Sequence, residues 1–153
     1  MSAEPLPVLV IGAGNEQCGD DAAGPLVARS IQSRSIPGVE VCAGDYDPLE
    51  LIDLWKSARA VILIDAMSSG RPPGTVDRFD VHDHPLPTGR FRHTSTHNMG
   101  VAEAIELARA LKQLPARFVV YGIEGRSFDP GSPLSPEVRL TANALVDLIV
   151  AAF

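Results

Sequence analysis

The chain has 153 residues, of which 45% are hydrophobic and 21% charged, and its formal net charge is -6. This length suits one well-filled core, and the composition is typical of a globular domain and not of a disordered chain. The negative excess, without a local basic patch, argues against nucleic-acid binding. No apolar run approaches the roughly 20 residues that span a bilayer. We therefore expect a single domain over residues 1–153, without a nucleic-acid or membrane partner.

Location is indicated by the first residues and by the cysteines. The opening stretch "MSAEPLPVLV" has no basic leader, so we expect no signal peptide. The two cysteines, Cys18 and Cys42, have no CxxC spacing, which fits free thiols in a reducing compartment. We expect a cytoplasmic monomer in which Cys18 is a small buried thiol.

Apolar runs and helical periodicity predict that strands and helices alternate along the chain. In chain order we expect a strand at 8–11, a helix at 21–31, a strand at 39–43, a helix at 48–57, a strand at 60–64, an edge strand at 75–81, a helix at 97–111, a strand at 118–123 and a helix at 133–153. The uninterrupted apolar runs at 8–11 and 60–64 are typical of central parallel strands, so these two should be buried neighbours. The alternation predicts an α/β fold: a three-layer sandwich with a mostly parallel sheet of about five strands.

Acidic residues gather where the predicted parallel strands end. They are Asp20 and Asp21 after the first strand, Asp45 and Asp47 after the second, Asp65 at the end of the third, and Glu124 after the last. No Lys or Arg stands at these strand ends before Arg126. Because ligands of open α/β sheets bind at the carboxyl ends of the strands, this acidic edge is the expected site.

Two binding functions fit this edge poorly. Gly12 and Gly14 begin a dinucleotide-binding pattern, but Gln17 stands where its last glycine should be, and adjacent carboxylates are unfavourable beside a pyrophosphate. A receiver-like phosphoacceptor domain also has an acidic pair and a strand-end Asp. It needs a Lys after the last strand to compensate the phosphoryl charge, and "VVYGIEGRS" contains none.

A transition-metal site needs a nitrogen donor besides the carboxylates. His82, His84 and His93 stand in polar stretches that are typical of solvated turns and loops. His97 follows three residues of the N-cap type, "TST", and is expected to open a helix from which it could reach the acidic edge. A role as a simple helix-start residue stays open for it.

Four stretches resemble the motifs of the [NiFe]-hydrogenase maturation proteases: "GAGNEQCGDDAAG", "ILIDAM", "STHNMGVAEAI" and "YGIEGRSFDPGSPLSPEV". They occur in the family's order and cover nearly the whole chain. The resemblance implies an aspartyl-type endopeptidase that removes a C-terminal extension from the hydrogenase large-subunit precursor after nickel is installed. Carried over residue by residue, it makes Asp21, Asp65 and His97 the nickel-contacting and catalytic residues, with Asp20 in a helix-capping or supporting role.

Nickel is then expected on the substrate, although other divalent transition metals could occupy the same site in vitro. The chain departs from many members in having Asp21 where they have Glu, and "AGDYDPLEL" where they have a Gly-Gly-Thr stretch. The second departure concerns the choice of substrate. Whether a metal-bound water or an Asp acting as base attacks the peptide stays open. So does a nickel-sensing chaperone that binds the large subunit without cutting it.

Overall fold

The chain folds around one mixed sheet, described in a computed structural model for residues 7–87, 89–91 and 100–153. The strands of this part are β1 (Val8–Ala13), β2 (Val39–Gly44), β3 (Ala60–Met67), β4 (Val76–Asp80) and β5 (Arg117–Glu124). The helices are a 3-10 turn η1 (Gly19–Ala22), α1 (Ala23–Gln32), α2 (Pro48–Trp55), α3 (Val101–Ala110) and α4 (Pro136–Ala151). None of the helices described is long and apolar enough to cross a membrane.

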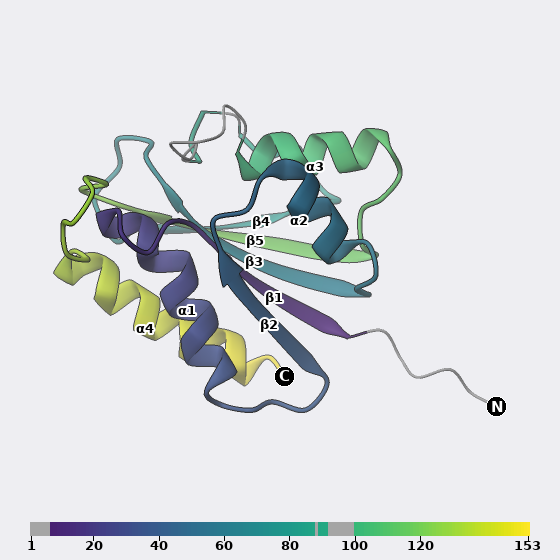
Figure 1. The fold of residues 1–153 in the computed structure, drawn as a ribbon, viewed down its shortest axis with the longest axis horizontal. Coiled ribbons are helices and arrows are strands. Elements are labelled where there is room, and N and C mark those ends of the chain that lie inside the picture. Colours follow the sequence, from purple (N-terminus) through teal and green to yellow (C-terminus); the bar gives the residue numbers. More distant parts are fainter. Residues whose placement is uncertain (1–6, 88, 92–99) are drawn as a thin grey trace.

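The sheet has the strand order β2-β1-β3-β5-β4, and only β4 runs antiparallel to its neighbour. Figure 1 shows α1 and α4 covering one face and α2 and α3 covering the other. Each face has its own apolar cluster, and on the α2 and α3 side Trp55 meets Phe118 edge to face, with ring centroids 4.8 Å apart. The predicted three-layer α/β sandwich of five strands is confirmed.

The two apolar runs singled out in the sequence are neighbours, as predicted. β1 and β3 pair in parallel, with Val8 opposite Ala60 and Gly12 opposite Ile64. Every residue of β1 is buried, and so are most residues of β3. Strands covered on both faces favour continuous apolar sequence, which explains why these two were the easiest to predict.

Several predicted boundaries were wrong by a few residues. β3 does not end at Asp65 but continues to Met67, because its last residues still pair with β5. The acidic pair does not begin the first long helix; it lies in the preceding turn η1, and α1 begins at Ala23. The last helix begins at Pro136 and not at Pro133, because extended Ser135 is its N-cap and proline favours the first helical position.

The third long helix also begins later than predicted. Gly100 is its extended N-cap, and the Gly100 N–H donates to Glu103 Oε2 at 3.0 Å. α3 therefore starts at Val101 and not at residue 97. His97 and His93 themselves lie outside the described residues, so their predicted roles stay predictions.

The chain order creates a switch point in the sheet. From β1 the chain moves outward to β2, then returns to place β3 on the other side of β1. Helices that follow β1 and β2 therefore cover opposite faces, α1 on one and α2 on the other (Figure 1). In open α/β sheets, ligands bind at the carboxyl ends of the two strands beside such a reversal, here β1 and β3.

Candidate active site at the carboxyl edge of the sheet

Two predicted site residues stand at this switch point. Asp21 lies in η1, which follows β1, and Asp65 lies near the carboxyl end of β3. They are only 5% and 4% exposed, respectively. Asp21 Oδ2 accepts the Asn15 N–H at 2.8 Å, and Asp65 Oδ1 accepts the Ala66 N–H at 2.9 Å. Both carboxylates are thus oriented by the local backbone.

Glycines allow the segment carrying Asp21 to approach the sheet. A Cβ on Gly24 would lie 2.4 Å from the Ile64 carbonyl oxygen, directly before Asp65. A Cβ on Gly12 would lie 2.3 Å from the Gly24 carbonyl oxygen. The start of α1 therefore packs against both central strands at the level of Asp65.

The Gly12–Gly14 pattern has the same structural purpose. Gly14 has φ +143°, and a Cβ there would lie 2.1 Å from the Asp21 carbonyl oxygen. The glycines are thus explained by close packing around Asp21, without a dinucleotide.

The lysine that a phosphoacceptor domain would need is also missing from this edge. The only two lysines of the chain, Lys56 and Lys112, precede β3 and β5 and so lie at the opposite edge.

Asp20, next to Asp21, anchors the turn η1 through hydrogen bonds. It is fully buried, and its carboxylate accepts four hydrogen bonds: the Arg126 N–H at 2.7 Å, the Ser127 N–H at 3.2 Å, and the Ser135 N–H and hydroxyl at 2.7 Å each. Burial by itself raises the pKa of Asp20, but these hydrogen bonds together outweigh it and hold the pKa below the ordinary value. Asp20 therefore connects η1 to the segment between β5 and α4.

Two further acids of this edge have structural partners. Glu124, 1% exposed, accepts the Ser69 N–H at 2.9 Å, the Ser69 hydroxyl, and the Arg71 N–H at 3.3 Å, so it fixes the loop after β3. Asp47 is the N-cap of α2 and exchanges hydrogen bonds with Glu50 in a capping box. The sequence signal for Asp47 was present, since "DPLE" places an N-cap, a proline and a glutamate at the expected spacing.

Tyr46 is a residue of this edge that the sequence did not single out. Its ring lies against Gly44 at the end of β2, and Cys42 is a close neighbour. Burial, with the neighbouring Cys42, raises the pKa of Tyr46 to about 12. The hydroxyl therefore stays protonated at neutral pH. The position of Tyr46 could not be predicted from the sequence, because it depends on the conformation of the turn after β2.

An open pocket of about 560 Å³ adjoins the segment that carries the acidic pair. It is lined by residues 15–18, before η1, and by residues 130–132, before α4. The two sides are connected by a hydrogen bond from the Gly131 N–H to the Gln17 carbonyl at 2.8 Å. Cys18 lines this pocket and is half-buried, so the prediction of a buried thiol was wrong. The glycine φ of +59° at Gly19 turns the chain here and leaves Cys18 at the rim.

The other predicted histidines are placed away from the acidic edge. His82 and His84 lie in the turn after β4. Because β4 runs antiparallel to β5, this turn lies beside the start of β5, and His82 Nε2 lies 2.7 Å from the Pro115 carbonyl. Both histidines are exposed, which confirms the interpretation of a solvated turn.

Asp21 and Asp65 are two of the three predicted metal-contacting residues, and the third, His97, is outside the described part of the chain. Within residues 7–87, 89–91 and 100–153, no group of three His, Cys, Asp or Glu residues could hold a metal ion. Of the predicted site residues, the structure thus describes the two carboxylates of Asp21 and Asp65. Such a pair can contribute oxygen ligands to a metal or act as a general base toward a water molecule.

The fold and candidate site define an open α/β protein with buried acids, Asp21 and Asp65 among them, at the switch point of its sheet. A model of the hydrogenase maturation protease family matches residues 25–152. The chain is 26% identical over 150 residues to the hydrogenase 2 maturation protease of Escherichia coli, covering 96% of this chain and 90% of that one. It is 27% identical to the hydrogenase expression/formation protein HupD of Thiocapsa roseopersicina, covering 86% of this chain but only 61% of that protein.

A solved structure agrees with the fold. The [NiFe] hydrogenase maturation protease HybD from Thermococcus kodakarensis superimposes with a TM-score of 0.70 at 25% identity, covering 96% of this chain and 99% of that chain. The chain therefore belongs to the hydrogenase maturation protease family.

Proposed function

We propose that this protein is the endopeptidase that removes the C-terminal extension of a nickel-loaded [NiFe]-hydrogenase large-subunit precursor. The observation that carries the proposal is the pair of buried carboxylates, Asp21 and Asp65, at the switch point of a sheet that belongs to this family. Burying a carboxylate is costly, so evolution retains such groups mainly where they bind, orient or react.

The nickel ion would belong to the substrate and not to the protease. Asp21 and Asp65 would contribute oxygen ligands and His97 a nitrogen ligand to the nickel ion that the large subunit carries. Because the substrate itself already coordinates nickel, contact from these residues would recognise the loaded state. Cleavage would then depend on nickel insertion, without a metal stored in the protease. Other divalent transition metals could occupy the same residues in vitro.

The chemical step uses groups that the same edge provides. A carboxylate of the pair, oriented by a backbone N–H, is suited to take a proton from an attacking water. Neither cysteine forms a disulfide, which agrees with action in a reducing cytoplasm.

The proposal is tested by incubating nickel-loaded precursor with the purified protein and measuring the mass of the large subunit. Loss of a mass equal to a C-terminal peptide is the expected result. Tight binding of the precursor without any change of mass would contradict the proposed protease and support a nickel-sensing chaperone instead.

A further inference from the structure

One long edge of the sheet is open. β2 is the outermost strand of the order, and only β1 pairs with it among the described residues. The carbonyl oxygens of Gly38 and Gly44 accept the N–H groups of Val8 and Gly14. The even-numbered residues of β2 therefore direct their backbone N–H and C=O groups toward β1. Because backbone groups alternate along a strand, Val41 and Ala43 direct their N–H and C=O groups outward.

A hollow lies on each side of this edge. On the α1 side, a hollow of about 400 Å³ is lined by the apolar side chains of Ile31, Ile36, Val39 and Val41, among others. On the α2 side, a hollow of about 160 Å³ is lined by residues that include Leu9, Cys42, Leu54 and Ala58. Glu40 and Val41 line both hollows.

An open strand edge with a hollow on each side suits the binding of an extended peptide better than the binding of a folded protein surface. Successive side chains of a strand point to opposite faces of the sheet. A peptide paired with the outer edge of β2 would therefore direct alternate side chains into the two hollows, while its backbone bonds to Val41 and Ala43. When a peptide is recognised as an added strand, its main-chain hydrogen bonds provide affinity and the pockets for its side chains provide specificity.

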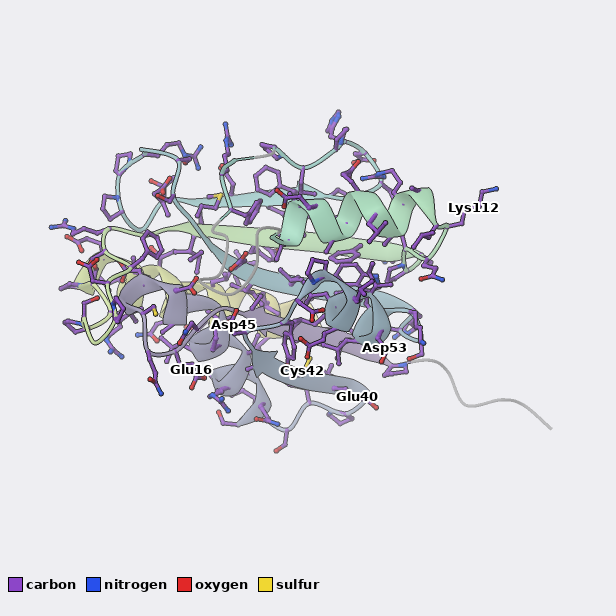
Figure 2. The ribbon with its side chains drawn as sticks, turned by 45° about the horizontal axis from the view of Figure 1, so that its top comes forward. Glu16, Glu40, Cys42, Asp45, Asp53 and Lys112 are labelled. Atoms are coloured by element: carbon purple, nitrogen blue, oxygen red, sulfur yellow. The ribbon has the colours of Figure 1, made fainter. Side chains whose placement is uncertain are left out.

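The edge leads toward the candidate active site. Figure 2 shows Glu40, Cys42 and Asp45 following one another along and beyond β2 toward Glu16, which lies in the loop after β1. β2 has six residues, which correspond to about 17 Å of strand. An added strand would lie about 10 Å from β1, two strand spacings away. Because these distances are short, one extended peptide can pair with the outer edge of β2 and also reach the carboxyl ends of β1 and β3.

We infer that the outer edge of β2 binds the C-terminal extension of the substrate as an added antiparallel strand. The inference rests on the proposed function, which places the scissile bond at the carboxyl ends of β1 and β3. Residues that follow this bond would leave the site at the end of β2 and run back along it, opposite to its direction. The extension is the segment of the substrate able to do so, because it ends in a chain terminus.

The hollows define the chemistry of this segment. The larger one is lined mainly by branched aliphatic side chains and takes an apolar side chain. Glu40 is exposed and belongs to both hollows, so a Lys or Arg of the extension pairs with it favourably. The recognised ligand is thus an extended peptide with an apolar residue and a basic residue on neighbouring positions.

Proline at position 41 tests the added strand. Val41→Pro removes the outward N–H and leaves the bonds between β1 and β2 in place, since proline is tolerated on edge strands. Val41→Ala is the matched control, because it loses the branched side chain but keeps the N–H. In trimming of nickel-loaded precursor, we expect Val41→Pro to raise KM about five- to tenfold relative to Val41→Ala, with kcat unchanged. Equal KM values in the two variants would overturn the inference.

Amide exchange of the wild-type protein gives a second readout that does not depend on how the variants fold. A synthetic peptide with the sequence of the extension should slow exchange at Val41 and Ala43, while the amide of Cys42, which faces β1, changes little. Unchanged exchange at both outward amides would overturn the inference. So would protection that rises with protein concentration without peptide, since a second copy would then occupy the edge.

The two proposals fail separately. If the wild-type protein does not trim the precursor, the proposed protease activity is wrong, and exchange with the extension peptide still decides whether the β2 edge binds it. If the wild-type protein trims normally and Val41→Pro trims with the same KM as Val41→Ala, only the β2 inference is wrong.

Discussion

Adjacent carboxylates have different tasks in this protein. Asp20 is fully buried and accepts four hydrogen bonds from the segment between β5 and α4. Asp21 is oriented by the Asn15 N–H and lies in η1, which follows β1 at the switch point of the sheet. The sequence shows only two like charges side by side. Their hydrogen-bond partners indicate that Asp20 stabilises the fold, whereas Asp21 is available for the proposed chemistry.

Asp20→Asn should destabilise the protein strongly. The amide nitrogen of Asn cannot accept a hydrogen bond, so it leaves the buried N–H of Ser135 or the partly buried N–H groups of residues 126 and 127 without their acceptor. We expect the free energy of unfolding to fall by about 2–4 kcal/mol, measured by urea denaturation. Asp53→Asn is the control, because Asp53 pairs with Lys56 at the surface and should cost less than about 1 kcal/mol. Equal losses in the two variants would contradict the anchoring role.

Asp20 should also make stability depend on pH. Its pKa is lower in the folded protein than its ordinary value of 3.8, so ionised Asp20 favours folding at higher pH. This contribution is complete above roughly pH 5 and disappears as the pH falls through the lowered pKa of the folded state. The free-energy difference between wild type and Asp20→Asn should therefore be constant from about pH 7 to pH 5 and shrink below about pH 4. A difference that grew on acidification would have the wrong sign.

At the scale of elements, the site depends on how closely α1 approaches the sheet. Gly12 and Gly24 stand at the contact, and a Cβ on either would come within 2.4 Å of a carbonyl oxygen. The contact cannot relax by a side-chain rotation, because the atoms involved belong to the backbone. α1 therefore holds η1, with Asp21, at one position relative to β3.

Gly24→Ala should disturb both stability and trimming. The new methyl group would displace the start of α1 from Ile64, at a cost of about 1–3 kcal/mol or more, and would shift Asp21 relative to Asp65. Gly38→Ala is the matched control. It has no atom within 4 Å of the new Cβ and costs only about 1–2 kcal/mol for its φ of +78°. Thermal melts and trimming rates of both variants check this, and normal trimming by Gly24→Ala would contradict the positioning argument.

The sequence predicted elements best where burial on both faces imposes a pattern. β1 and β3 are continuous apolar runs, and their parallel pairing was predicted correctly. The starts of α1 and α4 were predicted less well, because they depend on local capping and on the turn η1. Capping by Asp47 could have been predicted from "DPLE", whereas the four-bond role of Asp20 depends on residues more than a hundred positions away.

At the scale of the whole molecule, the topology brings acids from separate strands to one edge and leaves the lysines at the other. The sequence predicted this edge, since carboxyl ends of parallel strands share a side. It could not separate the structural acid Glu124 from the candidate pair, because only a tertiary contact with Ser69 distinguishes it. The likeness to the family, and not periodicity, selected Asp21, Asp65 and His97.

Nickel loading of the precursor should control trimming. If contact from the two carboxylates and His97 recognises nickel on the substrate, the protein should trim loaded precursor and leave nickel-free precursor intact at the same concentration. Mass measurement of both precursors over one time course checks this. Equal trimming of the nickel-free form would contradict nickel recognition while leaving the protease activity in place.

The central claim is that the carboxylate of Asp65 acts in cleavage and not in folding. Asp65→Asn keeps the shape and the oxygen that accepts the Ala66 N–H, and it removes one of several like charges at the edge. We compare it with Asp83→Asn, the same change in the exposed turn after β4. Thermal melting and trimming of nickel-loaded precursor are measured together on each protein. The account predicts that Asp65→Asn melts at or slightly above the wild-type temperature and trims at least about 100-fold more slowly, while Asp83→Asn trims normally. A folded Asp65→Asn protein that trims at the wild-type rate would contradict it.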